Sequence, residues 1–372
     1  MRIGLIGASG HYAAVLKILA EEMQGSGSNQ SEAGRSPAGR SGRRGHSGPA
    51  YLAAIAMTHE TEKAKIESVR RHPAYLKGKT VEYDSAQTML AQADLDAVIV
   101  NPPYGWTASY ILQALERGIA VYSEKPLATK LADLELIQKK AHQTATPLVA
   151  MFELRAHPVT ATAARLVAEG AIGRPVLAFG QKSYKLNPDG RPIWYADREL
   201  FGGTIPWVAI HAIDWTRFIT GLEFAQVYAS EISVAAGRLA PIATAGAIHF
   251  TFRQGGTAAI TFDYLRPAEA ETHGDDRFRI AGTEGVLEGS LPRNELLLIR
   301  RGQGTIQPPL DETKPLFRRF LDALYGKTLH GKAEMPMTAD DAIASTRAAL
   351  WAQKAADEGS LLDIAEGKDV VG

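Results

Sequence analysis

The chain has 372 residues, too many for one ordinary hydrophobic core, so we expect two domains. Its 41 basic and 41 acidic side chains cancel, so no overall charge draws it to nucleic acid or an anionic membrane. Cysteine is absent, which excludes disulfides, a thiolate nucleophile and cysteine-ligated metals. No apolar run approaches the roughly 20 residues of a membrane-spanning helix. Glycines also break the first apolar run, unlike in a signal peptide. We therefore expect a cytoplasmic protein.

Residues 1–150 alternate short apolar strands with amphipathic helices. Strands are expected at 2–6, 52–57, 97–100, 119–122 and 148–151, and helices at 13–23, 107–117 and 131–142. Short buried strands that alternate with helices predict a parallel sheet covered on both faces. We therefore predict an α/β fold that begins with a Rossmann-like, doubly wound domain over residues 1–150.

One segment, 24–50, fits neither domain. It is rich in Gly, Ser and Arg and has scarcely any apolar side chain to bury, so we expect a flexible insertion. Its four arginines could touch phosphates or RNA, but a solvated loop is the favoured interpretation.

Residues 151–372 have a different pattern, which predicts an α+β domain. Helices are expected at 158–169 and 205–220, with strands at 176–183, 226–234, 247–253, 258–264, 277–281, 286–288 and 296–300. The later strands follow one another too closely for crossover helices, so this sheet should be open and largely antiparallel. Helices at 316–325 and 339–356 close the chain, and we expect them to pack back toward the N-terminal domain.

The turn after the first strand is a candidate dinucleotide site, because a helix N-terminus offers backbone N–H groups and a favourable dipole to a pyrophosphate. A strict G-x-G-x-x-G would need glycine at positions 9 and 12, and the chain instead keeps Gly7, Gly10 and Ala13. The residues expected to contact the cofactor in this turn are Gly7, Ala8, Ser9, Gly10, His11 and Tyr12.

The end of the second strand bears on the choice of cofactor. An NAD-preferring site places an acid there for the ribose hydroxyls, and this chain has Thr58. With no carboxylate at that position to repel a 2′-phosphate, NADP is as plausible as NAD. His59 could contact such a phosphate, although an exposed loop histidine explains it equally well.

Tyr122-Ser123-Glu124-Lys125-Pro126 resembles the glucose-fructose oxidoreductase / inositol dehydrogenase (Gfo/Idh/MocA) family, whose members carry E-K-P at this point. The resemblance covers nearly the whole chain. It extends to Asn101-Pro102-Pro103 after the preceding strand, to the turn at 170–175, and to the segment from Gly202 through His211 and Asp214.

The family implies a bilobal NAD(P)-dependent oxidoreductase, with substrate between a Rossmann domain and an α/β domain whose open sheet mediates oligomerisation. Its chemistry transfers a hydride between nicotinamide and a secondary alcohol or carbonyl of a sugar, cyclitol or similar polyhydroxylated molecule. The resemblance therefore implies a homodimer or homotetramer. It also adds Asn101, Pro102, Pro103, Glu124 and Lys125 to the cofactor contacts.

Two residues are the candidate catalytic groups. A lysine at a strand end, between cofactor and substrate, can assist proton transfer, which is the role that the family implies for Lys125. His211 is the candidate acid–base group or substrate contact. The family's usual aspartate four residues before this histidine is Trp207, which cannot titrate. Trp207, His211 and Asp214 should share one face of a helix. We expect Trp207 to stack on a substrate ring and Asp214 to be a structural partner of His211.

The candidates for substrate contact all come from the second predicted domain. They are Arg155, Tyr184, Tyr195, Trp207, His211 and Asp214. Apart from His211, each of these residues could equally well be structural. No His, Asp or Glu cluster has metal-ligand spacing, so no metal is expected.

Two other functions fit the same features. One is NAD-dependent glycoside hydrolysis, used by a minority of proteins with this fold. The other is a non-catalytic dinucleotide sensor, which the altered glycine turn and Trp207 favour and which Lys125 and His211 oppose.

Overall fold

The computed structural model describes residues 1–25, 48–326 and 335–364. The chain divides into two compact units. The first holds Met1–Glu124, Ile137–Met151 and Phe317–Ala339, and the second holds Lys125–Leu136, Phe152–Leu316 and Asp340–Gly372. These boundaries differ from the predicted division at residue 150, because the chain returns to the first unit after residue 316. Most of the predicted insertion at 24–50 lies outside the described residues.

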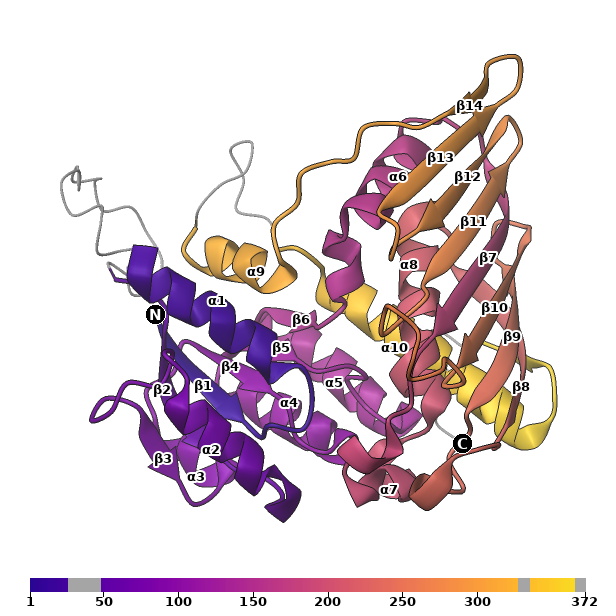
Figure 1. Ribbon diagram of the computed structural model, residues 1–372. Coiled ribbons are helices and arrows are strands. Elements are labelled where there is room, and N and C mark those ends of the chain that lie inside the picture. The colour runs from indigo at the N-terminus through magenta and orange to yellow at the C-terminus, as the bar shows by residue number, and fades with distance from the viewer. Residues whose placement is uncertain (26–47, 327–334, 365–372) are drawn as a thin grey trace, which may run out of the picture. The chain divides into compact units, whose positions relative to one another are not determined.

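The first unit is built on a six-stranded parallel sheet (Figure 1). Its strands are β1 (Arg2–Ile6), β2 (Tyr51–Ala56), β3 (Val81–Tyr83), β4 (Ala97–Val100), β5 (Ala120–Ser123) and β6 (Leu148–Ala150). They lie in the order β3-β2-β1-β4-β5-β6, and every neighbouring pair is parallel. The predicted doubly wound sheet is therefore confirmed, with a topological switch point between β1 and β4 where such sheets bind ligands.

Helices connect these strands as the alternating pattern predicts. They are α1 (Tyr12–Gly25), α2 (Lys63–Arg71), α3 (Ala86–Gln92), α4 (Thr107–Glu116) and α5 (Leu131–Thr144). The sequence analysis missed β3, α2 and α3. These elements are short, and the exposed Val81 and Glu82 of β3 give no apolar run to detect.

A late helix, α9 (Leu316–Leu324), completes the core of the first unit. The rings of Phe317 and Phe320 lie 4.9 and 5.4 Å from the ring of Tyr122 on β5. All three side chains are fully buried. Aromatic burial of this size dominates the energetics of a core, so the sheet depends on a helix almost 200 residues further along the chain.

The second unit contains a nine-stranded sheet, in the order β14-β13-β12-β11-β7-β10-β9-β8-β15. Its strands are β7 (Pro175–Ser183), β8 (Phe224–Ile232), β9 (Ala245–Phe252), β10 (Thr257–Asp263), β11 (Arg277–Gly282), β12 (Gly285–Ser290), β13 (Glu295–Arg300), β14 (Gly304–Ile306) and β15 (Leu362–Asp363). The neighbours β7 and β10 are parallel, and the other pairs are antiparallel. The predicted largely antiparallel sheet is confirmed.

Three long helices accompany this sheet: α6 (Pro158–Ala168), α8 (Ile210–Thr220) and α10 (Ala339–Glu358). Figure 1 shows α6 and α8 along one face of the sheet. α8 comes so close to β7 that a Cβ on Gly180 would lie 3.5 Å from Ala212 and Trp215. The side chains of Leu177, Phe179 and Tyr228, which alternate with buried positions on β7 and β8, are exposed. This face of the sheet thus carries exposed apolar groups.

The predicted helix at 205–220 is divided into two parts. Ile205–Ala209 form a π-helical turn, and α8 begins only at Ile210. Such wide turns are frequent at functional sites. Trp207 therefore lies in the wide turn and not on the α-helical face that carries His211. Among the helices of the described residues, none has the length and apolar character to cross a membrane.

Candidate active site

The turn after β1, the predicted dinucleotide site, is tightly packed in the first unit. Gly7 has a φ of +71°, a conformation that a side chain would disfavour. A Cβ on Gly10 would collide with the Glu124 carboxylate and lie 2.6 Å from Asn101 Oδ1. Both glycines are thus required by close approach of the chain, which explains why they are kept although the strict motif is lost.

Internal acceptors already bind several backbone N–H groups of this turn. Ala8 N donates to Glu62 Oε1 at 2.9 Å, and Ser9 N donates to the Asn101 carbonyl at 2.7 Å. His11 N donates to Glu124 Oε2 at 2.7 Å. The prediction that these amides bind the cofactor stays untested, and the acceptors that hold them come from the ends of β2, β4 and β5.

Glu124 is the part of the E-K-P motif that belongs to the first unit. Its side chain is fully buried, and Oε2 also lies 2.8 Å from His11 Nδ1. Glu124 therefore orders the start of α1.

The loop after β4 lies beside this turn. Asn101 is fully buried, and its Oδ1 has no hydrogen-bond partner among the described residues. The buried Pro102 and Pro103 follow it and lead to the short helical turn Tyr104–Trp106. The Trp106 ring lies 5.6 Å from the ring of His59, which follows β2. The loops at the carboxyl ends of β1, β2 and β4 thus gather at one edge of the sheet.

Glu62 is a residue that the sequence analysis missed. It stands four residues after Thr58, in a short helical turn (Glu60–Glu62) that follows β2. Its carboxylate is almost completely buried and accepts hydrogen bonds from Thr58 N at 2.8 Å and from Ser9 Oγ at 2.6 Å. Thr58 follows β2 as predicted, but the sequence analysis overlooked that Glu62 brings a carboxylate back to it. The capping pattern His59…Glu62 could have revealed it, because a capping box turns its acid back toward the preceding backbone.

Lys125 begins the second unit, and the peptide bond between Lys125 and Pro126 is cis. Its Nζ donates to the Trp207 carbonyl at 2.6 Å and lies 3.1 Å from the centroid of the Trp207 ring. Lys125 is only 1 % exposed. Trp207 therefore holds the ammonium group by both its backbone and its ring. This ring face was expected to stack on substrate, and in the structure it faces Lys125.

Tyr195 belongs to the same cluster. Its ring lies 6.4 Å from the Trp207 ring, edge to face, and 4.6 Å from the Phe201 ring in a stacked arrangement. Arg191 Nη1 donates to its hydroxyl at 3.1 Å. Three of the predicted site residues, Lys125, Trp207 and Tyr195, are thus brought together from distant parts of the second unit.

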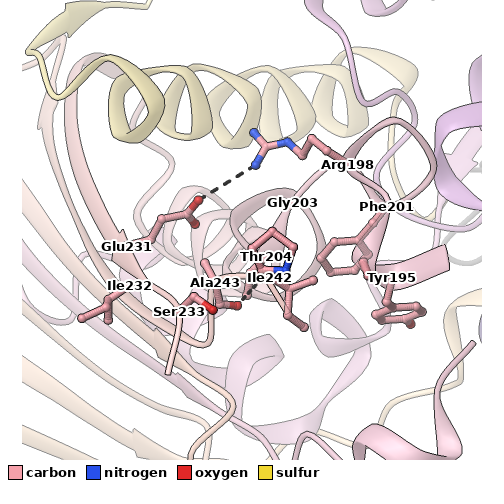
Figure 2. Close-up of a pocket in the computed structure, with 12 residues that line it drawn as sticks. Tyr195, Arg198, Phe201, Gly203, Thr204, Glu231, Ile232, Ser233, Ile242 and Ala243 are labelled. Atoms are coloured by element: carbon pink, nitrogen blue, oxygen red, sulfur yellow. Dashed lines mark hydrogen bonds and ion pairs between the residues drawn. The ribbon is translucent and has the colours of Figure 1, made fainter. Parts of the chain in front are cut away.

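Tyr195 also lines a cavity of about 370 Å³ (Figure 2). Phe201 and Ile242 add apolar wall, and Arg198 and Glu231 add charge. Glu231 Oε1 accepts from Gln353 Nε2 at 2.8 Å, whereas the buried Oε2 has no partner among the described residues. Burial raises the pKa of Glu231 in spite of the opposing effects of Gln353 and Arg198.

His211 lies on α8 and is 7 % exposed. Its ring meets the ring of Phe152 edge to face at 6.4 Å. The expected partner, Asp214, instead accepts two hydrogen bonds from Arg155, at 2.8 and 2.7 Å, and one from Ser345 Oγ at 2.7 Å. Arg155 and Ser345 are thus the partners that the structure gives to Asp214, and its pairing with His211 stays a prediction.

Arg155 and Asp214 are both almost completely buried. Because the Arg155 guanidinium group and the Asp214 carboxylate pair with each other through two hydrogen bonds, their geometry favours a structural role. Their contact with substrate stays a prediction.

Tyr184 lies in a separate cluster at the end of β7. Its ring lies 4.9 Å from the His273 ring in a tilted arrangement, and Lys182 Nζ lies 4.2 Å from the centroid of the Tyr184 ring. Lys182 is fully buried and donates to Asp276 Oδ2 at 2.5 Å. The sequence analysis missed Lys182, although a lysine in the inward series Ala178, Gly180, Lys182 is an unusual core position. In the described residues no cluster of His, Asp and Glu could hold a metal ion.

Comparison with known proteins matches both parts of the chain to one family. Residues 1–152 match an oxidoreductase family with an NAD-binding Rossmann fold, and residues 160–288 match the GFO/IDH/MocA C-terminal domain. A 1,5-anhydro-D-fructose reductase from Ensifer adhaerens is 29 % identical over 299 residues, which are 78 % of this chain and 85 % of the reductase.

Solved structures agree with this match. An oxidoreductase from Thermotoga maritima is 32 % identical with a TM-score of 0.81, over 98 % of this chain and 100 % of its own. A levoglucosan dehydrogenase solved with NADH and levoglucosan has a TM-score of 0.75 at 18 % identity, which shows a shared fold. That match covers 98 % of this chain and 100 % of the dehydrogenase chain.

Proposed function

Because the chain belongs to the GFO/IDH/MocA oxidoreductase family and has an NAD-binding Rossmann domain, we propose that it is a nicotinamide-dependent dehydrogenase or reductase. Its substrate in this proposal is a sugar, cyclitol or similar polyhydroxylated molecule, at which a secondary alcohol and a carbonyl are interconverted. The observation that carries the proposal is the position of Lys125, the lysine of the E-K-P motif, whose buried ammonium group lies against Trp207.

The turn after β1 suits the dinucleotide. Its glycines allow the tight turn against Asn101 and Glu124, and the 14-residue helix α1 directs its positive dipole end toward the turn. Since Ala8, Ser9 and His11 already donate within the protein, we assign the pyrophosphate to the amides of Gly10 and Tyr12. Glu124, the residue before Lys125, holds the end of this turn through His11. When bound, the cofactor accepts or supplies the hydride.

Lys125 then handles the proton. In oxidation its amine accepts the proton of the reacting hydroxyl, and in reduction its ammonium group returns that proton to the carbonyl oxygen. The Trp207 carbonyl and ring restrict the lysine to one position, so the proton is transferred at a fixed point. His211 is the second candidate for proton transfer, and Tyr195 is a candidate for substrate contact.

The cavity beside Tyr195 supports a polyhydroxylated ligand. A sugar ring has apolar C–H faces and polar edges. The walls formed by Tyr195 and Phe201, together with the charged Arg198 and Glu231, match that two-sided character (Figure 2).

We also propose that the uncovered face of the nine-stranded sheet joins copies of the chain. Phe179 and Tyr228 lie in one row across β7, β10, β9 and β8, through Ala259 and His249. Both are exposed, and apolar groups gathered on an open face mark association surfaces.

One assay separates the candidate functions. The protein is incubated with NAD⁺ or NADP⁺ and a panel of sugars, polyols and cyclitols, and reduced cofactor is followed by absorbance. Steady formation supports the proposal. Glycoside cleavage without net reduced cofactor would indicate a hydrolase, and binding without turnover would indicate a sensor.

A pair of lysine variants tests the mechanism. Lys125→Met should reduce turnover by roughly 10²-fold or more, as expected when a proton-transfer group is lost. The control is Lys130→Met, which removes a surface lysine paired with Glu199 at 2.7 Å and should leave turnover unchanged. Equal rates in both variants would remove Lys125 from the mechanism.

A further inference from the structure

Glu62 places a buried negative charge directly beneath the dinucleotide turn. It is 1 % exposed, and five donors surround its carboxylate. They are Ala8 N at 2.9 Å, Ser9 Oγ at 2.6 Å, Thr58 N at 2.8 Å, Thr58 Oγ1 at 3.1 Å and His59 N at 3.2 Å. All five contacts donate to the carboxylate, which is the arrangement that suits an acceptor-only group.

The position of this charge corresponds to the place where Rossmann folds discriminate between the two nicotinamide dinucleotides. The end of β2, beside the turn after β1, receives the adenosine ribose, and an acid there selects NAD. Here Thr58 occupies the strand end, and its N–H and hydroxyl both bind the carboxylate that Glu62 supplies from four residues further on. The same carboxylate binds the turn after β1 through Ala8 and Ser9. It therefore connects the two segments between which the ribose would lie.

We infer that Glu62 makes this site select NAD against NADP. The inference rests on the proposal that the turn at residues 7–12 holds the dinucleotide. A 2′-phosphate carries a charge of about −1.5 to −2 at neutral pH. Beside a buried carboxylate, that charge would be repelled with little screening by salt or water.

Lys65 brings an opposing charge to the same turn. Its Nζ donates to the Ser9 carbonyl at 3.1 Å from a half-buried position on α2. A site that accepted NADP would use such a lysine for the phosphate. Because Glu62 is more deeply buried than Lys65 and lies directly against Ser9 and Thr58, its repulsion decides the preference.

Calorimetry with NAD⁺ and NADP⁺ tests the inference without any substrate. The wild-type protein should bind NAD⁺ at least 10-fold more tightly than NADP⁺. Glu62→Gln should reduce this ratio by 10-fold or more, because the charge is lost. Glu62→Asp keeps the charge. It should preserve the preference for NAD⁺ even if its shorter side chain lowers the affinity for both nucleotides. The matched control is Glu67→Gln, which removes a surface glutamate of α2 that is 58 % exposed and should not change the ratio.

The ratio of the affinities for NAD⁺ and NADP⁺ is the decisive quantity, because damage to the turn lowers both affinities alike. A wild-type preference for NADP⁺ that Lys65→Met abolishes would overturn the inference. So would an unchanged ratio in a folded Glu62→Gln variant. A separate Gly10→Val variant distinguishes the underlying proposal: if neither affinity falls in it, the dinucleotide binds elsewhere and the proposed site is wrong as well.

Discussion

Asp214→Ala should destabilise the second unit strongly while leaving substrate recognition intact. The variant removes a carboxylate that accepts two hydrogen bonds from Arg155, at 2.8 and 2.7 Å, and one from Ser345. Arg155 is 5 % exposed, so its guanidinium group would stay buried. Breaking a buried ion pair in this way costs about 3–5 kcal/mol.

The cost should lie at the lower end of that range. Asp341 Oδ2 is 3.8 Å from Arg155 Nη1 and would partly neutralise the remaining charge. About 3 kcal/mol corresponds to a fall in Tm of roughly 6–12 °C for a unit of this size. Thermal unfolding followed by circular dichroism measures it, together with KM for the substrate found by the panel.

A surface ion pair provides the control. Arg165 and Asp311 are 3.0 Å apart, with side chains 41 % and 33 % exposed, so Asp311→Ala should cost less than about 1 kcal/mol. The reasoning fails if Asp214→Ala unfolds within 2 °C of the wild-type protein. A raised KM at unchanged stability would show instead that Asp214 contacts the substrate.

Three further variants test the remaining assignments. Trp207→Phe should keep most of kcat/KM, because the backbone carbonyl and an aromatic face remain for Lys125. His211→Ala should lose much more of kcat/KM. The reverse ranking would contradict the assignment of His211 to proton transfer. Burial raises the pKa of Glu231, so the native protein loses stability as its carboxyl ionises with rising pH. Glu231→Gln should therefore be more stable than wild type at pH 8 and similar at pH 4, and a Tm difference independent of pH would refute this. Phe179→Glu should convert the proposed oligomer to monomers in light scattering, and an unchanged mass would exclude this sheet face.

The sequence by itself determined the elements whose apolar pattern is continuous. β4 was predicted at its observed bounds, Ala97–Val100, because every side chain in it is buried and apolar. The turn at Gly7 and Gly10 was also recognisable, since local backbone geometry restricts those positions. The E-K-P motif identified the family for a similar reason: its residues are consecutive, so no knowledge of the fold is needed to find them.

The partners of buried polar groups were decided by the tertiary structure alone. Arg155 and Asp214 are 59 residues apart in sequence, and Lys125 and the Trp207 carbonyl are 82 apart. A sequence shows which side chains must find a partner when they are buried, but the partner is whichever opposite group the packed chain brings within 3 Å. For this reason helical spacing did not reveal Arg155 as a partner of Asp214, and Glu62, whose carboxylate turns back to Thr58, was missed.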